Sequence, residues 1–220
     1  MRALHLADAP LTTSRCAGEV VFPRQGAGIG NDVVDLGDPW AAGAHDRPRF
    51  VARVCTERER ERLETAADPS TLLWSMFAAK EAAYKVLSKL GHARILAHRA
   101  IVTGEALDVV ACERVSLRLL VSTGAGWVHA VAYLGDQPAF AEVAPADPDD
   151  ASGAARRLLC ARVALETGCA ASDFRVVRDP RPGSFTGYGP PRLLYGAGPV
   201  LGDVSLSHDG RFVACAAQLT

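Results

Sequence analysis

Residues 70–90 read STLLWSMFAAKEAAYKVLSKL, a run without glycine or proline that is rich in strong helix formers. Ser70 can cap the start of a helix here, and Gly91 can end it. We therefore expect one long helix over this stretch, and the rest of the fold is built outward from it.

One face of this expected helix carries chemistry. Phe77, Glu81 and Lys85 follow one another at intervals of four residues, so their side chains project from the same side. Small alanines around them allow another chain or a ligand to approach closely. Taken alone, the pattern is more typical of an ordinary ion pair on a solvated face, because such pairs are common.

The residues before the helix predict a strand and two shorter helices. GAGIGNDVVDL (26–36) leads from glycines into a β-branched run, which is typical of a strand entered from a tight turn. Burying Asp32 in such a strand is costly unless a cation or a basic group pairs with it, although an aspartate that caps a turn is the ordinary alternative. Pro48 suits a helix start, and Thr56 with Glu59 forms a T-x-x-E capping box.

The residues after the helix predict a sheet, a linker and a second helix–strand unit. Between 100 and 144 the sequence gives several short β-rich runs, and 144–153 is rich in Pro, Asp and Ala. An amphipathic helix follows over 154–168, and the chain ends in two strands. GWVHAVAYL begins at Gly126 and GRFVACAAQ at Gly210, an offset of 210 − 126 = 84 residues that suggests an internal repeat.

The last strand pair contains VSLSHDG (204–210). Ser205 and Ser207 share one side of the strand, and His208 shares the other with Gly210. A hydroxyl, an imidazole and a glycine at a strand end can grip a phosphate or a heterocycle. A lone histidine in a turn is more often an ordinary polar residue.

Composition excludes several classes of protein. The net charge of −1 predicts no general attraction to nucleic acid or membrane, and no stretch is apolar enough to span a bilayer. The six cysteines lie singly, without metal-site spacing, which favours reduced thiols in a cytoplasmic protein.

Three segments together resemble one family. GIGNDVVDL, WSMFAAKEAAYK and VSLSHDGRFVACA are similar to motifs of the phosphopantetheinyl transferases. Asp32 matches the first metal-binding aspartate of the family, and Lys80, Glu81 and Lys85 match its helix motif. Ser207 and His208 match the segment with which the family holds coenzyme A.

The resemblance implies an architecture. The motif order is that of the short, holo-acyl-carrier-protein synthase type, but the length suits the longer, pseudo-dimeric type. We therefore expect an α+β fold, a pseudo-dimer of two similar halves, each a helix packed on a small antiparallel sheet. The expected divisions are an N-terminal extension (1–25), a first half with the metal motifs (26–144), a linker (145–153) and a second half (154–220).

Two departures affect the implied site. Where the longer type has its second acidic ligand, this chain has Val34, so Asp35 is the remaining candidate for a further metal ligand. The cation usual before the serine–histidine segment is replaced by proline in GPPRL (189–193). Arg192 can supply it, or Arg178 and Arg181 can.

The resemblance implies Mg²⁺-dependent transfer of 4′-phosphopantetheine from coenzyme A to a serine of an apo acyl or peptidyl carrier protein, with release of adenosine 3′,5′-bisphosphate. This chemistry serves fatty acid, polyketide or nonribosomal peptide biosynthesis. A homologue that binds coenzyme A or a carrier without reaction is the alternative. We expect a monomer.

The implied roles fall on the motif residues. Asp32, Glu81 and Asp35 would bind the metal; Glu81 and Lys85 would be catalytic. The expected contacts to coenzyme A come from Lys85, Arg192, Ser207 and His208. An acidic carrier would dock on Arg47, Arg49 and Arg53, unless these residues only form a solvated face as the alternating Arg and Glu of residues 57–62 do.

Overall fold

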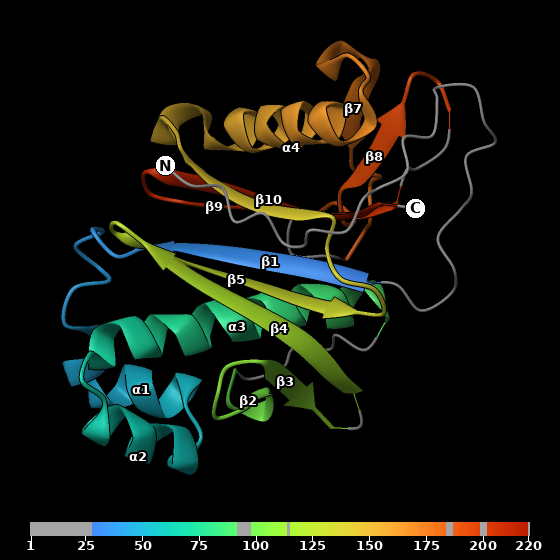
Figure 1. The fold of residues 1–220 in the computed structure, drawn as a ribbon. Coiled ribbons are helices and arrows are strands. Elements are labelled where there is room, and N and C mark those ends of the chain that lie inside the picture. Colours follow the sequence, from blue (N-terminus) through green and yellow to red (C-terminus); the bar gives the residue numbers. More distant parts are fainter. Residues whose placement is uncertain (1–27, 92–97, 114, 184–186, 199–201, 220) are drawn as a thin grey trace.

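The computed structural model describes residues 28–91, 98–113, 115–183, 187–198 and 202–219. The expected extension over 1–25 lies outside these residues. The chain forms two units, each with a helix on one side of an antiparallel sheet, and the two sheets face each other between the helices α3 and α4 (Figure 1). The expected α+β class is confirmed.

The first unit (residues 28–134) is a five-stranded sheet in the order β1-β5-β4-β3-β2, covered by α3. Its strands are β1 (Gly28–Asp35), β2 (Val102–Thr103), β3 (Val109–Cys112), β4 (Val115–Gly124) and β5 (Trp127–Leu134). Its helices are the 3₁₀ helix η1 (Ala44–Asp46), α1 (Pro48–Val54), α2 (Glu57–Thr65), α3 (Pro69–Lys89) and the 3₁₀ helix η2 (His98–Ala100).

The second unit (residues 140–219) repeats this plan at a smaller size. A three-stranded sheet in the order β6-β10-β9 lies beside a two-stranded sheet of β7 and β8, and α4 packs on β9 and β10. The elements are β6 (Phe140–Pro145), η3 (Pro148–Asp150), α4 (Ala151–Thr167), η4 (Ala171–Asp173), β7 (Phe174–Val177), β8 (Arg192–Tyr195), β9 (Gly202–Asp209) and β10 (Phe212–Leu219).

The two units share their strand order, but the repeat has a different offset from the predicted one. Strand order β1-β5-β4 corresponds to β6-β10-β9. The β4–β5 hairpin closes with Gly124 opposite Trp127, and the β9–β10 hairpin closes with Asp209 opposite Phe212. The offset is therefore 212 − 127 = 85, not 84. A shift of one residue would turn every side chain to the other face of its strand. Gly126 and Gly210, which the sequence comparison aligned, therefore do not occupy equivalent positions.

The strand pairing favours a different division between the halves from the predicted one. β6 pairs with β10 and so belongs to the second sheet, although the prediction placed residues up to 144 in the first half. α4 begins at Ala151, inside the predicted linker, because Asp147 caps the short helix η3 that leads into it. Gly168 ends α4 in the left-handed conformation (φ 70°), as expected. We propose that the division lies between β5 and β6.

The start of α3 differs in detail from the prediction. The capping residue is Asp68, whose carboxylate accepts the amide N–H of Thr71 at 2.9 Å, and Pro69 takes the first helical position. Ser70 is already inside the helix. At α2, the predicted capping box of Thr56 and Glu59 is present.

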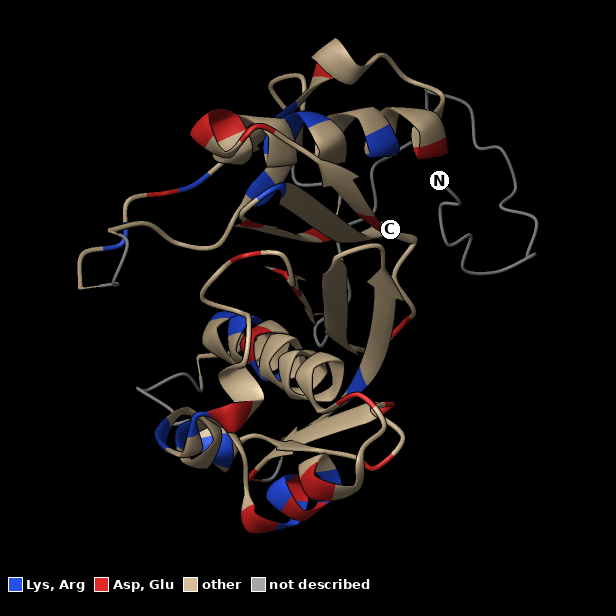
Figure 2. Cartoon of the chain, turned by 90° about the vertical axis from the view of Figure 1, so that its left-hand side faces the viewer, with Lys and Arg blue, Asp and Glu red and all other residues tan. Residues whose placement is uncertain are grey.

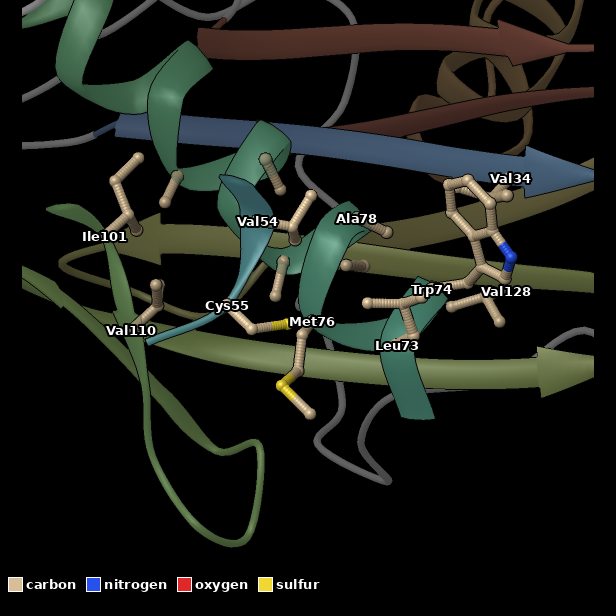
Figure 3. Packing of buried hydrophobic residues seen from close by; sticks show 14 of the residues in the cluster. Val34, Val54, Cys55, Leu73, Trp74, Met76, Ala78, Ile101, Val110 and Val128 are labelled. Atoms are coloured by element: carbon tan, nitrogen blue, oxygen red, sulfur yellow. The ribbon is translucent and has the colours of Figure 1, made fainter. Parts of the chain in front are cut away.

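The core of the first unit lies between α3 and the sheet. α3 buries Leu73, Trp74, Met76 and Ala78 against strands and against the short helix α1 (Figure 3). Gly30 of β1 makes this contact close, because a Cβ at this position would lie 2.1 Å from the carbonyl oxygen of Ala82. The glycine before Asp32 therefore brings β1 and α3 together.

The two units meet along β1 and β9, through side chains rather than a backbone ladder. Alternate residues of β9 accept hydrogen bonds from alternate main-chain N–H groups of β1, which satisfies the free edge of that strand. The pairs are Ile29 with Asp203 (2.7 Å), Asn31 with Ser205 (2.9 Å), Val33 with Ser207 (3.2 Å) and Asp35 with Asp209 (2.8 Å). This polar joint places the metal motif of the first unit beside the serine–histidine segment of the second.

Candidate active site

A cavity of about 470 Å³ opens where the two units meet. Its walls come from β1, the turn after β1, α3 and the β9–β10 hairpin. The residues that line it are Asp32, Val33, Val34, Asp38, Trp40, Ala41, Trp74, Phe77, Glu81, His208 and Asp209. Four carboxylates therefore face one space, next to three aromatic rings and an imidazole.

Asp32 is held by partners from both units. Its Oδ1 accepts a hydrogen bond from Lys85 Nζ of α3 at 2.9 Å and another from Ser207 Oγ of β9 at 2.8 Å. Burial raises the pKa of Asp32 above its ordinary value, and the charge and hydrogen bonds of these two partners offset only part of that rise. The carboxylate is thus costly to keep charged in this position, which favours a cation nearby.

Glu81 lies on the same cavity and has a different partner. Its Oε1 lies 2.5 Å from Nε2 of His98, at the start of η2. Burial raises the pKa of Glu81, but the hydrogen bond and charge of His98 and the charge of Lys85 together outweigh burial and lower it. The charge of Glu81 also contributes to the raised pKa of Asp32, so the two carboxylates interact.

Lys85 lies behind Asp32 rather than in the cavity wall. Its Nζ donates to the main-chain oxygen of Asn31 at 2.6 Å as well as to Asp32. The structure therefore places the ammonium where it fixes one of the two acids. The predicted contact of Lys85 with coenzyme A stays a prediction.

The two residues of the serine–histidine segment have different surroundings. Ser207 is buried, accepts the N–H of Val33 and donates to Asp32. His208 is exposed and lines the cavity. Of the two predicted coenzyme A contacts, only His208 stands where a ligand in the cavity can reach it, and Ser207 holds Asp32.

Asp35 does not face the cavity, and its geometry is that of a structural ion pair. Arg211 binds both of its carboxylate oxygens, at 2.8 and 2.6 Å, and donates a main-chain hydrogen bond at 3.0 Å. Gly37 donates another at 2.8 Å. The hydrogen bonds of Arg211 lower the pKa of Asp35 to about 2. This geometry does not support the predicted metal-binding role of Asp35, because its oxygens are already occupied between the two hairpins.

Arg192 is not brought to the cavity either. It lies on β8, and its guanidinium forms an exposed ion pair with Asp179 at 2.8 Å. Arg178 and Arg181, the predicted alternatives, are also absent from the cavity lining. The cation that would hold the 3′-phosphate of coenzyme A stays unassigned among these three.

The structure adds residues that the motifs did not predict. Asp209, next to His208, lines the cavity, and burial raises its pKa, as do the charges of nearby aspartates. Asp38 and Trp40 come from the turn after β1. Asp209 lies in the serine–histidine segment VSLSHDG, so the sequence offered a signal for it as a site residue. His98 gave no signal, because its contact with Glu81 depends on the path of the chain after α3.

The aromatic residues form one wall. The ring of Trp74 lies 5.4 Å from that of Trp40 and 5.3 Å from that of Phe77, measured between centroids. Phe50 of α1 packs behind them. Trp40 leaves 53% of its surface exposed, so the wall reaches the outside of the molecule.

The donor set of the cavity fits Mg²⁺. Among the described residues no three His, Cys, Asp or Glu side chains are already arranged as a metal cage. Mg²⁺ is usually held by one or two carboxylates, with water and substrate phosphates completing its shell. Asp32 and Glu81 line one cavity, and the charge of Glu81 makes Asp32 costlier to ionise, which matches that pattern.

Comparison with known proteins supports the resemblance seen in the motifs. Residues 28–103 match the family model of the 4′-phosphopantetheinyl transferase superfamily. The resemblance to the phosphopantetheinyl transferases predicted from the motifs is thereby confirmed. No curated protein matches the chain.

Two solved structures are similar to parts of the chain. One is a holo-[acyl-carrier-protein] synthase from Neisseria meningitidis, with 22% identity and a TM-score of 0.41, covering 50% of this chain and 98% of that one. Another is the holo-[acyl-carrier-protein] synthase from Thermotoga maritima, with 15% identity and a TM-score of 0.38, covering 78% of this chain and 84% of that one. The similarity to the family rests on the match of residues 28–103. No helix in the described part of the chain has the length and apolar character to cross a bilayer.

Proposed function

We propose that this member of the 4′-phosphopantetheinyl transferase superfamily moves 4′-phosphopantetheine from coenzyme A to a serine hydroxyl of an apo acyl or peptidyl carrier protein, in a Mg²⁺-dependent reaction in the cytoplasm. The observation that carries the proposal is the cavity in which Asp32 and Glu81 of the first unit face His208 of the second. It unites all three family motifs in one space.

In this reaction the serine oxygen forms a bond to the β-phosphorus of coenzyme A, and the bond between that phosphorus and the bridging oxygen breaks. Adenosine 3′,5′-bisphosphate leaves with the electron pair. Asp32 and Glu81 would hold the Mg²⁺, which when bound neutralises charge on the diphosphate oxygens.

Individual side chains would accept the proton, position Asp32 and bind the nucleotide. Oε1 of Glu81 is bonded to His98, so we assign Oε2 as the atom that accepts the serine proton. Lys85 of the first unit and Ser207 of the second both donate to Oδ1 of Asp32 and keep this carboxylate in place. His208 is suited to the nucleotide end of coenzyme A, because it is exposed at the mouth of the cavity in the second unit.

The aromatic wall has a role in the same cavity. Trp40, Trp74 and Phe77 offer no hydrogen-bonding group to water across their faces, so they limit water beside the reacting phosphate. This limits hydrolysis in competition with transfer.

We propose that the carrier docks on α1, next to this wall. Arg49 and Arg53 are exposed there, whereas the guanidinium of Arg47 is tied to the main-chain oxygens of Trp40 and Ala42. Figure 2 shows basic residues on the short helices at one end of the molecule, away from α4. The guanidinium of Arg53 lies over the ring of Phe50, 5.7 Å from its centroid. An acidic carrier would be attracted to the exposed Arg49 and Arg53.

The docking proposal has a matched control. Arg58 of α2 is equally exposed but already pairs with Glu105 at 3.3 Å. We expect charge reversal at Arg49 and Arg53 to raise the KM for the carrier about tenfold with the KM for coenzyme A unchanged, and Arg58→Glu to change neither by more than about twofold. Equal effects of the two changes on the KM for the carrier would contradict docking on α1.

The direct test of the activity is to mix the protein with coenzyme A, Mg²⁺ and an apo carrier protein, and to measure the mass of the carrier. We expect a gain equal to one phosphopantetheine, which requires Mg²⁺. Tight binding of coenzyme A without any gain on acyl or peptidyl carriers would contradict transfer and favour a non-catalytic binding protein.

A further inference from the structure

Within the part of the chain that the structure describes, His98 is the residue outside α3 that hydrogen-bonds the carboxylate of Glu81. It is the first residue of η2, which follows α3 in the chain, and its Nε2 lies 2.5 Å from Oε1 of Glu81. An ionised carboxylate only accepts hydrogen bonds, so Nε2 carries the proton and donates it in this contact.

A second contact fixes the ring of His98. The imidazole is stacked on the ring of Phe77, with the centroids 5.1 Å apart and the planes 16° from parallel. Phe77 precedes Glu81 by one turn of α3, so the two residues share a face of the helix. The imidazole is therefore held between the residue on which it stacks and the residue to which it donates.

His98 itself does not line the cavity, whereas Phe77 and Glu81 do. It can therefore affect chemistry in the cavity through Glu81, to which it donates, or through Phe77, on which it is stacked. An isolated exposed ion pair fixes little, because the two side chains keep their freedom. Here both side chains are about three-quarters buried, at 27% and 30% exposed, and the stacking has already fixed the ring.

We infer that His98 is a positioning residue, which holds the Glu81 carboxylate in the orientation needed to bind the divalent cation and to accept the proton of the attacking hydroxyl. The inference rests on the proposed function, because that function gives Glu81 its role. Each acid of the site then has its own support: Lys85 and Ser207 for Asp32, and His98 for Glu81.

Two substitutions separate the hydrogen bond from the stacking. His98→Phe keeps an aromatic ring against Phe77 but has no donor. His98→Gln gives up the ring but has an amide N–H that can reach Glu81. A purely structural role for the ring predicts that the phenylalanine variant is the better of the two, and the positioning role predicts the reverse.

The first readout is affinity for Mn²⁺, used as a paramagnetic substitute for Mg²⁺ and titrated by electron paramagnetic resonance with the full-length protein. Loss of a residue that orients a metal ligand typically weakens binding 10- to 100-fold. We expect His98→Phe to weaken Mn²⁺ binding about tenfold. His98→Gln should remain within about threefold of the wild type.

The second readout is the transfer assay. We expect His98→Phe to lower kcat about tenfold or more, with the KM for the carrier unchanged, and His98→Gln to recover most of that loss. Thermal unfolding of each variant identifies any that does not fold. The matched control is His45→Phe, since His45 has a similar exposure (29%) and contacts an acid, Asp46, away from the cavity.

The outcomes separate the inference from the function on which it rests. Wild-type protein that transfers nothing would contradict the proposed function, and the Mn²⁺ affinities would still decide whether His98 orients Glu81. Phenylalanine and glutamine variants with equal Mn²⁺ affinity, or a phenylalanine variant as good as the wild type, would overturn the positioning role.

Discussion

The two units of the molecule contain the same ion pair, but only one of them carries a site. Asp32 of β1 lies opposite Ala130, and Glu142 of β6 lies opposite Cys215, so the two acids occupy equivalent positions at the offset 215 − 130 = 85. Asp32 is paired with Lys85 of α3 at 2.9 Å. Glu142 is paired with Arg162 of α4 at 2.8 Å.

The surroundings of the two pairs differ. One turn before Lys85 stands Glu81, which faces the cavity, whereas one turn before Arg162 stands Leu158, which packs in the apolar core. Arg162 also binds Glu166 at 2.8 Å and lies over the ring of Phe140, which occupies its guanidinium.

The hairpins that complete each site differ as well. His208 and Asp209 of the β9–β10 hairpin correspond to Thr123 and Gly124 of the β4–β5 hairpin at the offset of 85. The strand–helix ion pair is therefore a structural device common to both units. The first unit differs from the second in two features of its cavity: the carboxylate of Glu81 on α3 and the imidazole of His208 on the β9–β10 hairpin.

The largest effect on transfer activity should come from replacing Glu81. We expect Glu81→Gln to lower transfer at least about 100-fold, because it removes both a metal ligand and a proton acceptor. The measurement is the rate of carrier mass gain at saturating coenzyme A. The control is Glu142→Gln, at the position equivalent to Asp32 in the second unit, which should leave the rate within about twofold; equal losses in the two variants would make the two units functionally alike.

Stability should respond to the two ion pairs in the same way. Removing the cation of a mostly buried pair leaves an uncompensated carboxylate, so we expect Lys85→Met and Arg162→Met each to lower the free energy of unfolding by about 2 kcal/mol. Denaturant unfolding measures this. Activity of the folded protein should fall only in the Lys85 variant, and a large loss in the Arg162 variant would place the second pair in the mechanism.

Ser207 and its counterpart Ser122 test the joint between the units. Ser207→Ala leaves the N–H of Val33 without its acceptor and Asp32 without one of its donors, so we expect a loss of about 1–2 kcal/mol and a slower transfer. Ser122→Ala should cost less than about 0.5 kcal/mol. An equal loss of stability in both variants, by urea unfolding, would argue against a special role for the joint.

The smallest effect concerns the ion pair of Asp35 with Arg211. The folded-state pKa of Asp35, about 2, lies below its ordinary value of 3.8. Its contribution to stability is therefore complete above about pH 4 and is lost as the pH falls through 2. Arg211→Met should be less stable than the wild type at pH 7 and should lose less between pH 4 and 2, followed by circular dichroism. If the stability of the wild type and of Arg211→Met fell equally between pH 4 and 2, the pairing of Asp35 with Arg211 would be contradicted.

Much of the secondary structure could be predicted from local sequence signals. The helix around Glu81, the capping box of Thr56 and the strands were predictable because propensity and caps act over a few residues. The predicted cap of α3, Ser70, lies two residues after the observed cap, Asp68. Asp68, Pro69 and Ser70 are all good starting residues, and only the structure selects among them.

The contacts of the site were not predictable in the same way. Ser207 meets Asp32 across 175 positions of the chain, and Arg211 meets Asp35 across 176. The family resemblance implied that Asp32, Glu81 and Lys85 belong to one site, and in the structure Asp32 and Glu81 line one cavity while Lys85 donates to Asp32. It could not show that Ser207 supports Asp32, or that Arg211 occupies Asp35, because both depend on how the units are joined.

The most direct test of a single site built from both units is the binding of coenzyme A by isothermal titration calorimetry in the presence of Mg²⁺. We predict one coenzyme A per chain for the wild type and for Glu142→Gln, and strongly weakened binding for Asp32→Asn. Two coenzyme A molecules per chain, or loss of binding in the Glu142 variant with Asp32→Asn unaffected, would contradict the assignment of the site to Asp32, Glu81 and His208.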